Sequence, residues 1–341
     1  MTAKERFTKA LRLADPPDRV PVAPPFQGYW ALDAFGVSTP ESLTHPKKAV
    51  AAIVKAQTAC PFDALEIVWD WFAFVDLLGC TSQITAAGSP SVVEHALHSF
   101  AEVADLALVD TSASSRVQAS LVAAEALLEE LGDEVFCYAS LPLPFTLAGH
   151  LLGVADLMTG LIEHADEAHR LIEFSTEVVV RHLRLYADLG VHGFVLSDPT
   201  ASGDLISPRH YEKYAAPCTR SVIEVLEKLG MPSILHVCGK TAKILPLVAD
   251  TGATAFSFDA SVDTAVVKQA IGASVCLLGN LDPVGLLLDG SADAVREAAR
   301  SCVAKGWEGG GFVLGSGCDL SLHTPLENIR AMIEVGHEAR Y

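Results

Sequence analysis

The segment 193–237 opens with Gly193-Phe-Val-Leu-Ser197 and closes with Pro232-Ser-Ile-Leu-His-Val237, two short and almost entirely apolar runs. Near-continuous apolar character is typical of strands that are covered on both faces. The residues 207–229 between them have a helical pattern, in which Ser207 and Pro208 fit the start and Gly230 fits the end. The segment therefore predicts two parallel strands joined by a helix.

Eight strand–helix units of this kind follow one another along the chain. The predicted strands are 19–23, 64–69, 134–139, 193–197, 232–237, 254–258, 274–278 and 311–314, and helical patterns occupy 46–59, 115–131, 165–189, 207–229, 242–250, 291–305 and 325–340. Eight units predict an α/β fold, a TIM (β/α)8 barrel with extra N-terminal helices, and we treat residues 1–341 as one domain. Residues 77–106 exceed the length of a simple connection, so we expect an insertion after the second strand, either a small hairpin or extra helices.

A doubly wound open sheet is the alternative arrangement of alternating strands and helices. That fold commonly binds nucleotides through a glycine-rich loop. No G-x-G-x-x-G follows the first predicted strand, and no Walker-type loop with Lys-Ser/Thr occurs in the sequence. The barrel is therefore the favoured prediction.

Composition narrows the class of protein. Half of the 341 residues are hydrophobic and the formal net charge is -18, which disfavours binding to nucleic acid or to an anionic membrane. No apolar run approaches the ~18 residues of a membrane-spanning helix, and no hydrophobic region follows the charged N-terminus, so we predict a cytoplasmic protein. Eight cysteines in so long a chain indicate free thiols. A homo-oligomer is compatible with this composition, but no stripe of residues marks an interface.

His236 and Cys238 lie at the end of one predicted strand, and Cys318 lies near the end of another. Side chains two positions apart on an extended backbone point to the same face. If Cys318 reaches that face, one imidazole and two thiolates form a zinc ligand set with an open fourth position. A thiol that binds there loses its proton and becomes a nucleophile at neutral pH. The competing interpretation is a chance His-x-Cys pattern among cysteines that merely pack in the core.

Further polar residues stand where the predicted strands end. They are Gln27, Asp70, Ser140, Asp198, Asp259, Asn280 and Asp282. Because the catalytic groups of TIM barrels occupy this C-terminal rim, these residues are candidates for the active site. Strand ends also need side chains that satisfy the loop backbone, which is the structural alternative for each aspartate.

A set of motifs spread over nearly the whole chain points to a family. They are Arg6-Phe7, Asp18-Arg-Val-Pro-Val22, Phe62-Asp-Ala64, Asp70, Leu78-Gly79, Pro144-Phe-Thr-Leu-Ala148, Asp198-Pro-Thr-Ala201, Ser207-Pro208, His236-Val-Cys-Gly239, Gly279-Asn-Leu-Asp-Pro283, Gly317-Cys-Asp319 and Thr324-Pro-Leu-Glu-Asn328. In these motifs the chain resembles the uroporphyrinogen decarboxylase superfamily, and within it the methylcobamide:coenzyme M methyltransferase-like branch. The stretch that follows Val20 lacks the arginines with which the decarboxylase branch clamps its polycarboxylate substrate, which disfavours that branch.

The resemblance implies a zinc-dependent methyltransferase. His236, Cys238 and Cys318 would bind Zn2+, and a thiol such as coenzyme M would bind the zinc as a thiolate and exchange a methyl group with a methylcobamide, a corrinoid. Asp70 and Asp259 would be catalytic. In the related cobalamin-independent methionine synthases an acidic residue at a comparable place joins the zinc ligands, so Asp259 is also a candidate fourth ligand.

The resemblance also bears on substrates and partners. Gln27, Asp198, Asn280 and Asp282 would bind the small thiol or methylated substrate. The sequence contains no Asp-x-His-x-x-Gly cobalamin signature, so we expect the corrinoid to be carried by a separate protein.

Three other functions share these motifs. One is a demethylase that passes a methyl group from a methyl donor to a corrinoid protein, or a transferase to tetrahydrofolate. Trp69, Trp71, Phe72 and Phe74 could then stack on an aromatic methyl ether, although core packing competes as an explanation. The others are a uroporphyrinogen decarboxylase-like enzyme and a non-catalytic barrel that binds zinc or a tetrapyrrole.

Overall fold

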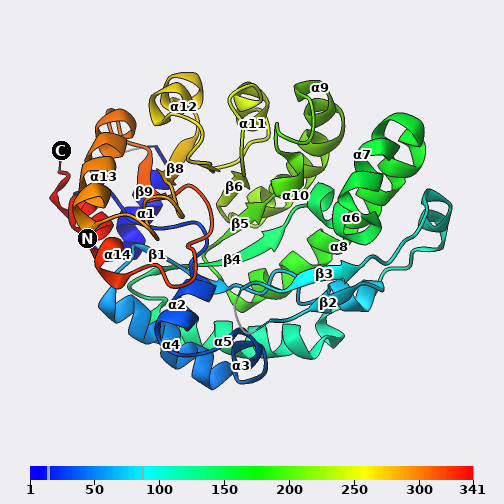
Figure 1. The fold of residues 1–341 in the computed structure, drawn as a ribbon, viewed down its shortest axis with the longest axis horizontal. Helices are drawn as coiled ribbons and strands as arrows, with labels where there is room; N and C mark the ends of the chain where they lie inside the picture. The colour runs from blue at the N-terminus through cyan, green and yellow to red at the C-terminus, as the bar shows by residue number, and fades with distance from the viewer. Residues whose placement is uncertain (14–15, 86–87, 341) are drawn as a thin grey trace.

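Seven parallel strands form one curled sheet in the computed structural model, which describes residues 1–13, 16–85 and 88–340 (Figure 1). The order in the sheet is β1 (Ala64–Val68), β4 (Phe136–Pro142), β5 (Gly193–Ser197), β6 (Ser233–Val237), β7 (Ala255–Phe258), β8 (Cys276–Leu281) and β9 (Phe312–Ser316). Helices follow the strands and surround the sheet (Figure 1). Because neighbouring strands run parallel and in chain order, all their C-terminal ends meet at one rim, as predicted.

The predicted first strand closes the sheet through a single bridge instead of a full ladder. Val22 bridges Leu314 of β9; Leu314 donates its N–H to the Pro21 oxygen at 2.9 Å and accepts the Ala23 N–H at 2.9 Å. On the other side, Asp63 donates its N–H to the Val22 oxygen at 2.8 Å. Pro21 has no N–H to contribute, so the ladder cannot lengthen. The α/β barrel fold is confirmed, but the expectation of a full eighth strand is wrong.

The helices agree with most of the predicted segments. They are α1 (Ala3–Leu11), α2 (Gly28–Ala34), α3 (Thr39–Thr44), α4 (Pro46–Ala59), α5 (Ser115–Leu131), α6 (Pro144–Leu152), α7 (Val154–Glu163), α8 (Ala165–Leu189), α9 (Pro208–His210), α10 (Ala216–Lys228), α11 (Leu245–Ala249), α12 (Thr264–Ile271), α13 (Ala292–Gly306) and α14 (Leu326–Glu338). The predicted helix 207–229 is interrupted by a π-helical turn, Tyr211–Ala215, just before Pro217, which lacks an N–H. Helices α6, α7 and α12 were not predicted, and α11 is shorter than expected.

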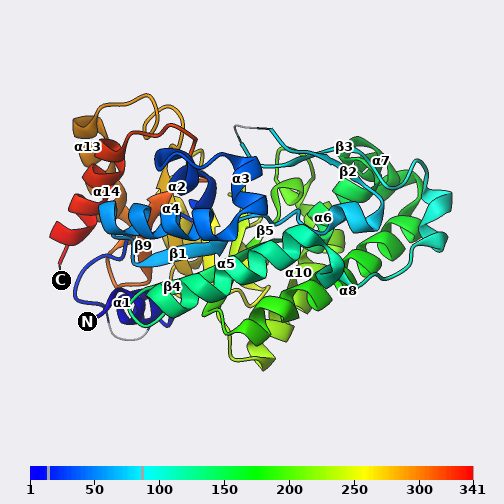
Figure 2. The ribbon, with the colours of Figure 1, turned by 90° about the horizontal axis from the view of Figure 1, so that it is seen from below.

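The expected insertion after β1 contains both a hairpin and short helices. Between β1 and α5 the chain forms 3-10 turns at Val75–Leu78, Phe100–Asp105 and Thr111–Ala113, and the antiparallel pair β2 (Thr81–Gln83) and β3 (Ser91–Glu94). In Figure 2 this hairpin lies along the upper side of the molecule, away from α1 at the lower left. The insertion therefore extends the rim side of the barrel.

Helix α1 packs against the opposite end of the barrel. Phe7, Ala10 and Leu11 share a hydrophobic cluster with inward-facing strand residues such as Phe136 and Ile234. Phe7 is fully buried, and burial of such a side chain contributes roughly 1.5–3 kcal/mol.

A buried ion-pair cluster fastens α1 and the closing segment to the start of β1. The carboxylate of Asp63, fully buried, accepts from Arg6 Nη1 at 2.7 Å, Arg19 Nη1 at 2.8 Å and the Val22 N–H at 2.8 Å. Arg6 Nε also bonds Asp18 at 2.6 Å. Each guanidinium meets a carboxylate, so the charges are compensated where water is excluded.

Among the described residues, no single helix is long and apolar enough to cross a membrane. Helices α6 and α7 pass that test of length and composition only as a pair, and they are bent by 104° at their junction.

Candidate metal centre

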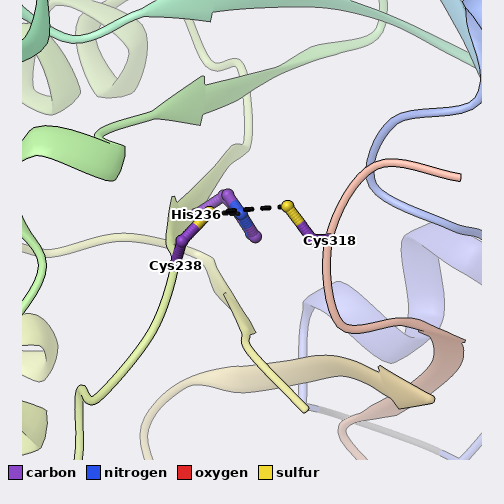
Figure 3. Close-up of side chains that lie close together, drawn as sticks. All are labelled: His236, Cys238 and Cys318. Carbon is purple, nitrogen blue, oxygen red and sulfur yellow. Dashed lines mark hydrogen bonds between the residues drawn. The ribbon is translucent and has the colours of Figure 1, made fainter. Parts of the chain in front are cut away.

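Three side chains from two separate strand ends converge at the rim. His236 is in β6, Cys238 follows that strand, and Cys318 follows β9; their side chains point toward one another (Figure 3). A ring nitrogen of His236 and the two Sγ atoms all lie within 4.8 Å of one another. His236 Nε2 is 3.0 Å from Cys238 Sγ, which is 3.4 Å from Cys318 Sγ. Within the described ranges no other three His, Cys, Asp or Glu side chains form such a group.

The neighbouring strand fixes the orientation of the imidazole. His236 pairs in register with Ser257 of β7, and the Ser257 Oγ lies 3.0 Å from His236 Nδ1. That hydrogen bond leaves Nε2 directed at Cys238. The ring of Phe26 meets the imidazole edge-on with centroids 5.0 Å apart. A metal-binding histidine commonly has its second nitrogen fixed in this manner.

A tight turn brings Cys238 back toward the rim. Gly239 adopts φ +69°, a conformation that other residues rarely adopt, and a Cβ there would lie 2.3 Å from Asp204 Oδ2. The glycine therefore allows the chain to turn sharply directly after the ligand strand.

The donor set fits a zinc ion. Bonds of ~2.1 Å to nitrogen and ~2.3 Å to sulfur place ligands of a tetrahedral zinc roughly 3.5–3.8 Å apart. The nitrogen and sulfur separations of 3.0 and 3.4 Å are close to that spacing. One imidazole and two thiols are ligands that zinc prefers, and three protein ligands leave a position for substrate.

The two thiols have unequal acidities. The hydrogen bond between the two thiols lowers the pKa of Cys318, and His236 adds to the effect. The same hydrogen bond, together with burial, raises the pKa of Cys238. The contact therefore favours loss of the first proton from this pair of thiols.

Asp259 lies beside the three ligands and outside the converging group. It follows β7, and its Oδ1 accepts from the Ser261 N–H at 2.7 Å. Burial raises its pKa, but hydrogen bonds from the backbone of Ser261 and Gly239 outweigh burial and hold the pKa below its usual range. The carboxylate is therefore charged and borders the loop that carries Cys238.

Asp70 is held in a bidentate ion pair. Its two oxygens accept from Arg116 Nη2 at 2.7 Å and Nε at 2.9 Å, and Arg116 also contacts Asp76 at 2.9 Å. Burial raises the pKa of Asp70, and the guanidinium opposes that increase. The pair anchors the insertion to α5.

Asp198 and Gln27 are both buried at the rim with an oxygen that the described side chains and backbone leave unbonded. Asp198 Oδ1 accepts from Thr146 Oγ1 at 2.7 Å, whereas Oδ2 has no partner. Burial raises the pKa of Asp198 to about 7. Gln27 Nε2 donates to the Ala64 oxygen at 3.0 Å, and Oε1 has no partner. Both groups retain hydrogen-bonding capacity.

Asn280 and Asp282 bond to nearby backbone. Asn280 Nδ2 donates to the Asp259 and Val262 oxygens at 3.0 and 2.6 Å. Asp282 is exposed, and its Oδ1 accepts from the Val284 N–H at 2.9 Å, which closes a turn. These contacts organise loops.

Sequence reasoning missed Ser257, Glu66 and Arg116. Glu66 is buried in β1, where its Oε2 accepts the N–H groups of Gln27 and Gly28 at 2.9 and 2.8 Å. A lone carboxyl within the apolar run 64–68 was a usable signal. Ser257 and Arg116 become visible only once strand register and the α5 start are known.

The comparisons with known proteins agree with one another. The family model of uroporphyrinogen decarboxylase (URO-D) matches residues 2–339. The methylcobamide:CoM methyltransferase MtbA of Methanosarcina mazei is 29% identical over 348 residues, which cover 100% of this chain and 99% of that protein. A methylated-thiol--coenzyme M methyltransferase of the same organism is 29% identical over 341 residues, 99% of this chain and 90% of that protein. A solved structure, a methyltransferase from Methanosarcina mazei, has a TM-score of 0.90 and 26% identity, and covers 99% of both chains.

Proposed function

Since this chain belongs to the uroporphyrinogen decarboxylase family, we propose that it is a zinc-dependent methyltransferase that moves a methyl group between a protein-bound methylcobamide and a small thiol. The convergence of His236, Cys238 and Cys318 at the barrel rim carries the proposal. The two relatives whose names specify coenzyme M support a thiol as the methyl acceptor.

His236, Cys238 and Cys318 would hold the metal. When bound, zinc favours the thiolate form of a substrate thiol and so provides a nucleophile at neutral pH. His236 presents Nε2 because Ser257 occupies Nδ1. The two cysteine thiolates contribute negative charge, which keeps electron density on the substrate sulfur.

The rim residues would orient the substrate. Asp198 Oδ2 and Gln27 Oε1 have no partner among the described residues. Because burial raises the pKa of Asp198 to about 7, its protonated form would donate from Oδ2 to an acceptor on the thiol's polar substituent, such as a sulfonate. Asp70 would act through Arg116, by fixing the rim beside the site. Asp259 stands beside the ligands as a charged group and a candidate fourth ligand, and Asp282 shapes the loop after β8.

A separate corrinoid protein would be the partner. The chain has no Asp-x-His-x-x-Gly signature for holding a corrinoid itself. Cys238 and Cys318 are only half-buried, so the ligand atoms lie near the surface that such a partner must approach.

Metal analysis tests this function. Purified, reduced protein should contain about one zinc per chain, and Cys238→Ala and Cys318→Ala should each lack it. X-ray absorption after addition of 2-mercaptoethanesulfonate should show one more sulfur ligand at about 2.3 Å. Methyl transfer from methylcobalamin to that thiol should require the metal.

Two results would contradict the proposal. One is wild-type protein that neither contains nor takes up zinc. The other is a four-ligand metal site whose spectrum ignores every added thiol, which would indicate a purely structural metal.

A further inference from the structure

We propose that Asn280 is a positioning residue for the metal centre: its amide fixes the segment 259–262, which lies against both loops that carry the cysteine ligands. The inference rests on the proposed function for its metal. It reassigns Asn280, which the sequence suggested as a substrate-binding residue.

Both ends of the Asn280 amide are engaged. Nδ2 donates to the backbone oxygens of Asp259 at 3.0 Å and Val262 at 2.6 Å, and Oδ1 accepts from Thr264 Oγ1 at 2.7 Å. Two carbonyl oxygens can only accept, so the amide has one allowed orientation. Both N–H bonds are used within the protein, and the segment 259–262 is pinned at its two ends.

The pinned segment contacts the Cys238 loop. The last residues of β6 and β7 pair in register, Val237 with Phe258, so the loops that begin at Cys238 and Asp259 leave the sheet side by side. The backbone of Gly239, the residue after Cys238, also lowers the pKa of the Asp259 carboxylate. The Ser261 N–H bonds the same carboxylate at 2.7 Å and fixes its direction. Movement of the segment would therefore displace the charged carboxylate that lies beside the turn after Cys238.

The same segment contacts the Cys318 loop. A Cβ on Gly317 would lie 2.5 Å from the Ala260 nitrogen and 3.1 Å from its Cα, so these two backbones are in close contact. The Gly317 N–H also donates to the Leu281 oxygen at 2.7 Å. Leu281 directly follows Asn280, so two adjacent residues of β8 bond both the segment 259–262 and the loop that carries Cys318.

Asn280 thus determines the spacing of ligands that are 80 residues apart in sequence. Loss of its amide would leave two carbonyl groups unpaired and allow the segment 259–262 to move. The loops of Cys238 and Cys318 would then be less constrained, and a bound metal would dissociate faster. Mutation of a polar group that supports a metal ligand typically weakens metal affinity by 10- to 100-fold.

The chain offers a matched control in Asn328. This buried side chain on α14 has the same donor pattern: its Nδ2 donates to the Leu287 and Gly290 oxygens at 3.0 and 2.9 Å, whereas its Oδ1, unlike that of Asn280, has no partner among the described residues. Leu287 and Gly290 belong to the loop between β8 and α13, and not to the segment 259–262 or to the turns at Cys238 and Cys318. Asn328→Leu therefore reproduces the structural loss without the proposed positioning effect.

The experiment compares zinc release from wild type, Asn280→Leu, Asn280→Asp and Asn328→Leu. The full-length zinc-loaded proteins are mixed with a colorimetric chelator, and the cobalt-substituted proteins supply thiolate-to-metal absorption bands. Asn280→Asp retains the side chain's shape and the acceptor for Thr264, and replaces the N–H donors by an oxygen. It keeps the test valid if Asn280→Leu does not fold.

We expect both Asn280 variants to release zinc roughly 10- to 100-fold faster than wild type and to alter the cobalt spectrum. Asn328→Leu should lower thermal stability yet release zinc at the wild-type rate. Equal release rates in the Asn280 and Asn328 variants would overturn the inference while leaving the proposed function intact. Absence of zinc uptake by wild type would instead remove the proposed function itself.

Discussion

The buried carboxylate of Asp63 at the N-terminal end of the barrel and several buried polar side chains at the rim differ in how completely they are hydrogen-bonded. At the N-terminal end both oxygens of Asp63 are fully bonded, Oδ1 to Arg6 and Arg19 and Oδ2 to Arg19 and the Val22 N–H. At the rim, polar atoms of Gln27, Tyr29, Asp198 and Asp319 are buried without a partner among the described residues.

This difference in hydrogen bonding suggests that Asp63 serves the stability of the fold and that the rim side chains serve ligand binding. A buried polar atom left without any hydrogen bond costs about 1–3 kcal/mol, a cost that the fully bonded carboxylate of Asp63 avoids. A ligand or ordered water that bonds to the rim atoms recovers that cost. Because one end of the barrel secures the fold, the other can keep hydrogen-bonding groups available.

Removal of a metal ligand should abolish the proposed function of the rim without lowering the stability that the N-terminal end provides. Cys318→Ala should abolish stoichiometric zinc binding and methyl transfer, whereas the unfolding free energy of the metal-free protein should change little. Zinc titration, a methylcobalamin assay and denaturation in chelator measure these three quantities. Cys276→Ala removes a fully buried cysteine elsewhere and should keep both zinc and activity. Full activity in Cys318→Ala would exclude the site as the catalytic centre.

Removal of the buried carboxylate at the N-terminal end should lower the stability of the fold without affecting zinc binding at the rim. Asp63→Ala leaves Arg6 and Arg19 buried without their shared carboxylate, which should lower the free energy of unfolding by about 3–5 kcal/mol. Zinc content per folded chain should stay at the wild-type value. Urea denaturation and metal analysis of the folded fraction test this pair of outcomes. A stable variant that had lost its zinc would show that the two ends are not independent.

The buried carboxyl group of Glu66 should make the free energy of unfolding depend on pH. Burial raises its pKa from 4.5 to about 7, although the hydrogen bonds that it accepts from the backbone of Gln27 and Gly28 lower it. The folded state then binds a proton more tightly than the unfolded state, so stability falls as pH rises from about 4.5 to about 7 and levels off above. Glu66→Gln should remove up to about 3 kcal/mol of that dependence.

Chemical denaturation at half-unit intervals between pH 4 and 8 measures the effect of Glu66. Some slope should persist in the variant, because burial also raises the pKa of Asp198 to about 7. An unchanged slope in Glu66→Gln would mean that Glu66 does not titrate in this range.

The smallest expected effect concerns Ser257, which touches the metal centre only through His236. Ser257→Ala removes the 3.0 Å contact with His236 Nδ1 and should weaken zinc affinity about 10- to 100-fold. Stability at the N-terminal end should not change. Competition with a chelator of known affinity gives the value, and Ser257→Thr, which keeps the hydroxyl, should restore much of it. An affinity equal to wild type would show that another group orients the imidazole.

The sequence allowed the fold and the ligand candidates to be predicted from local features. Apolar runs located all seven strands of the sheet, and their ends located His236, Cys238 and Cys318. The closing segment was misjudged because Pro21 looks acceptable in a short apolar run, yet its missing N–H limits pairing to one bridge.

The roles of rim residues could not be read in the same way. Asn280 stands at a strand end just as Asp198 does, but its amide is used by loop carbonyls, whereas Asp198 keeps one oxygen unbonded. That distinction depends on which backbone atoms approach from other loops. Ser257 became relevant only through its register with His236. Long-range pairing of this kind leaves no local pattern.

The separation of the two cysteine ligands has a consequence for biosynthesis. Cys238 and Cys318 are 80 residues apart, and β7, β8 and β9 lie between them in the chain. At 5–20 residues per second a ribosome needs roughly 4–16 s to pass from one cysteine to the other. Throughout that interval the nascent chain offers only the His-x-Cys half of the site, so selective metal loading must wait for translation to move well beyond the first ligand pair.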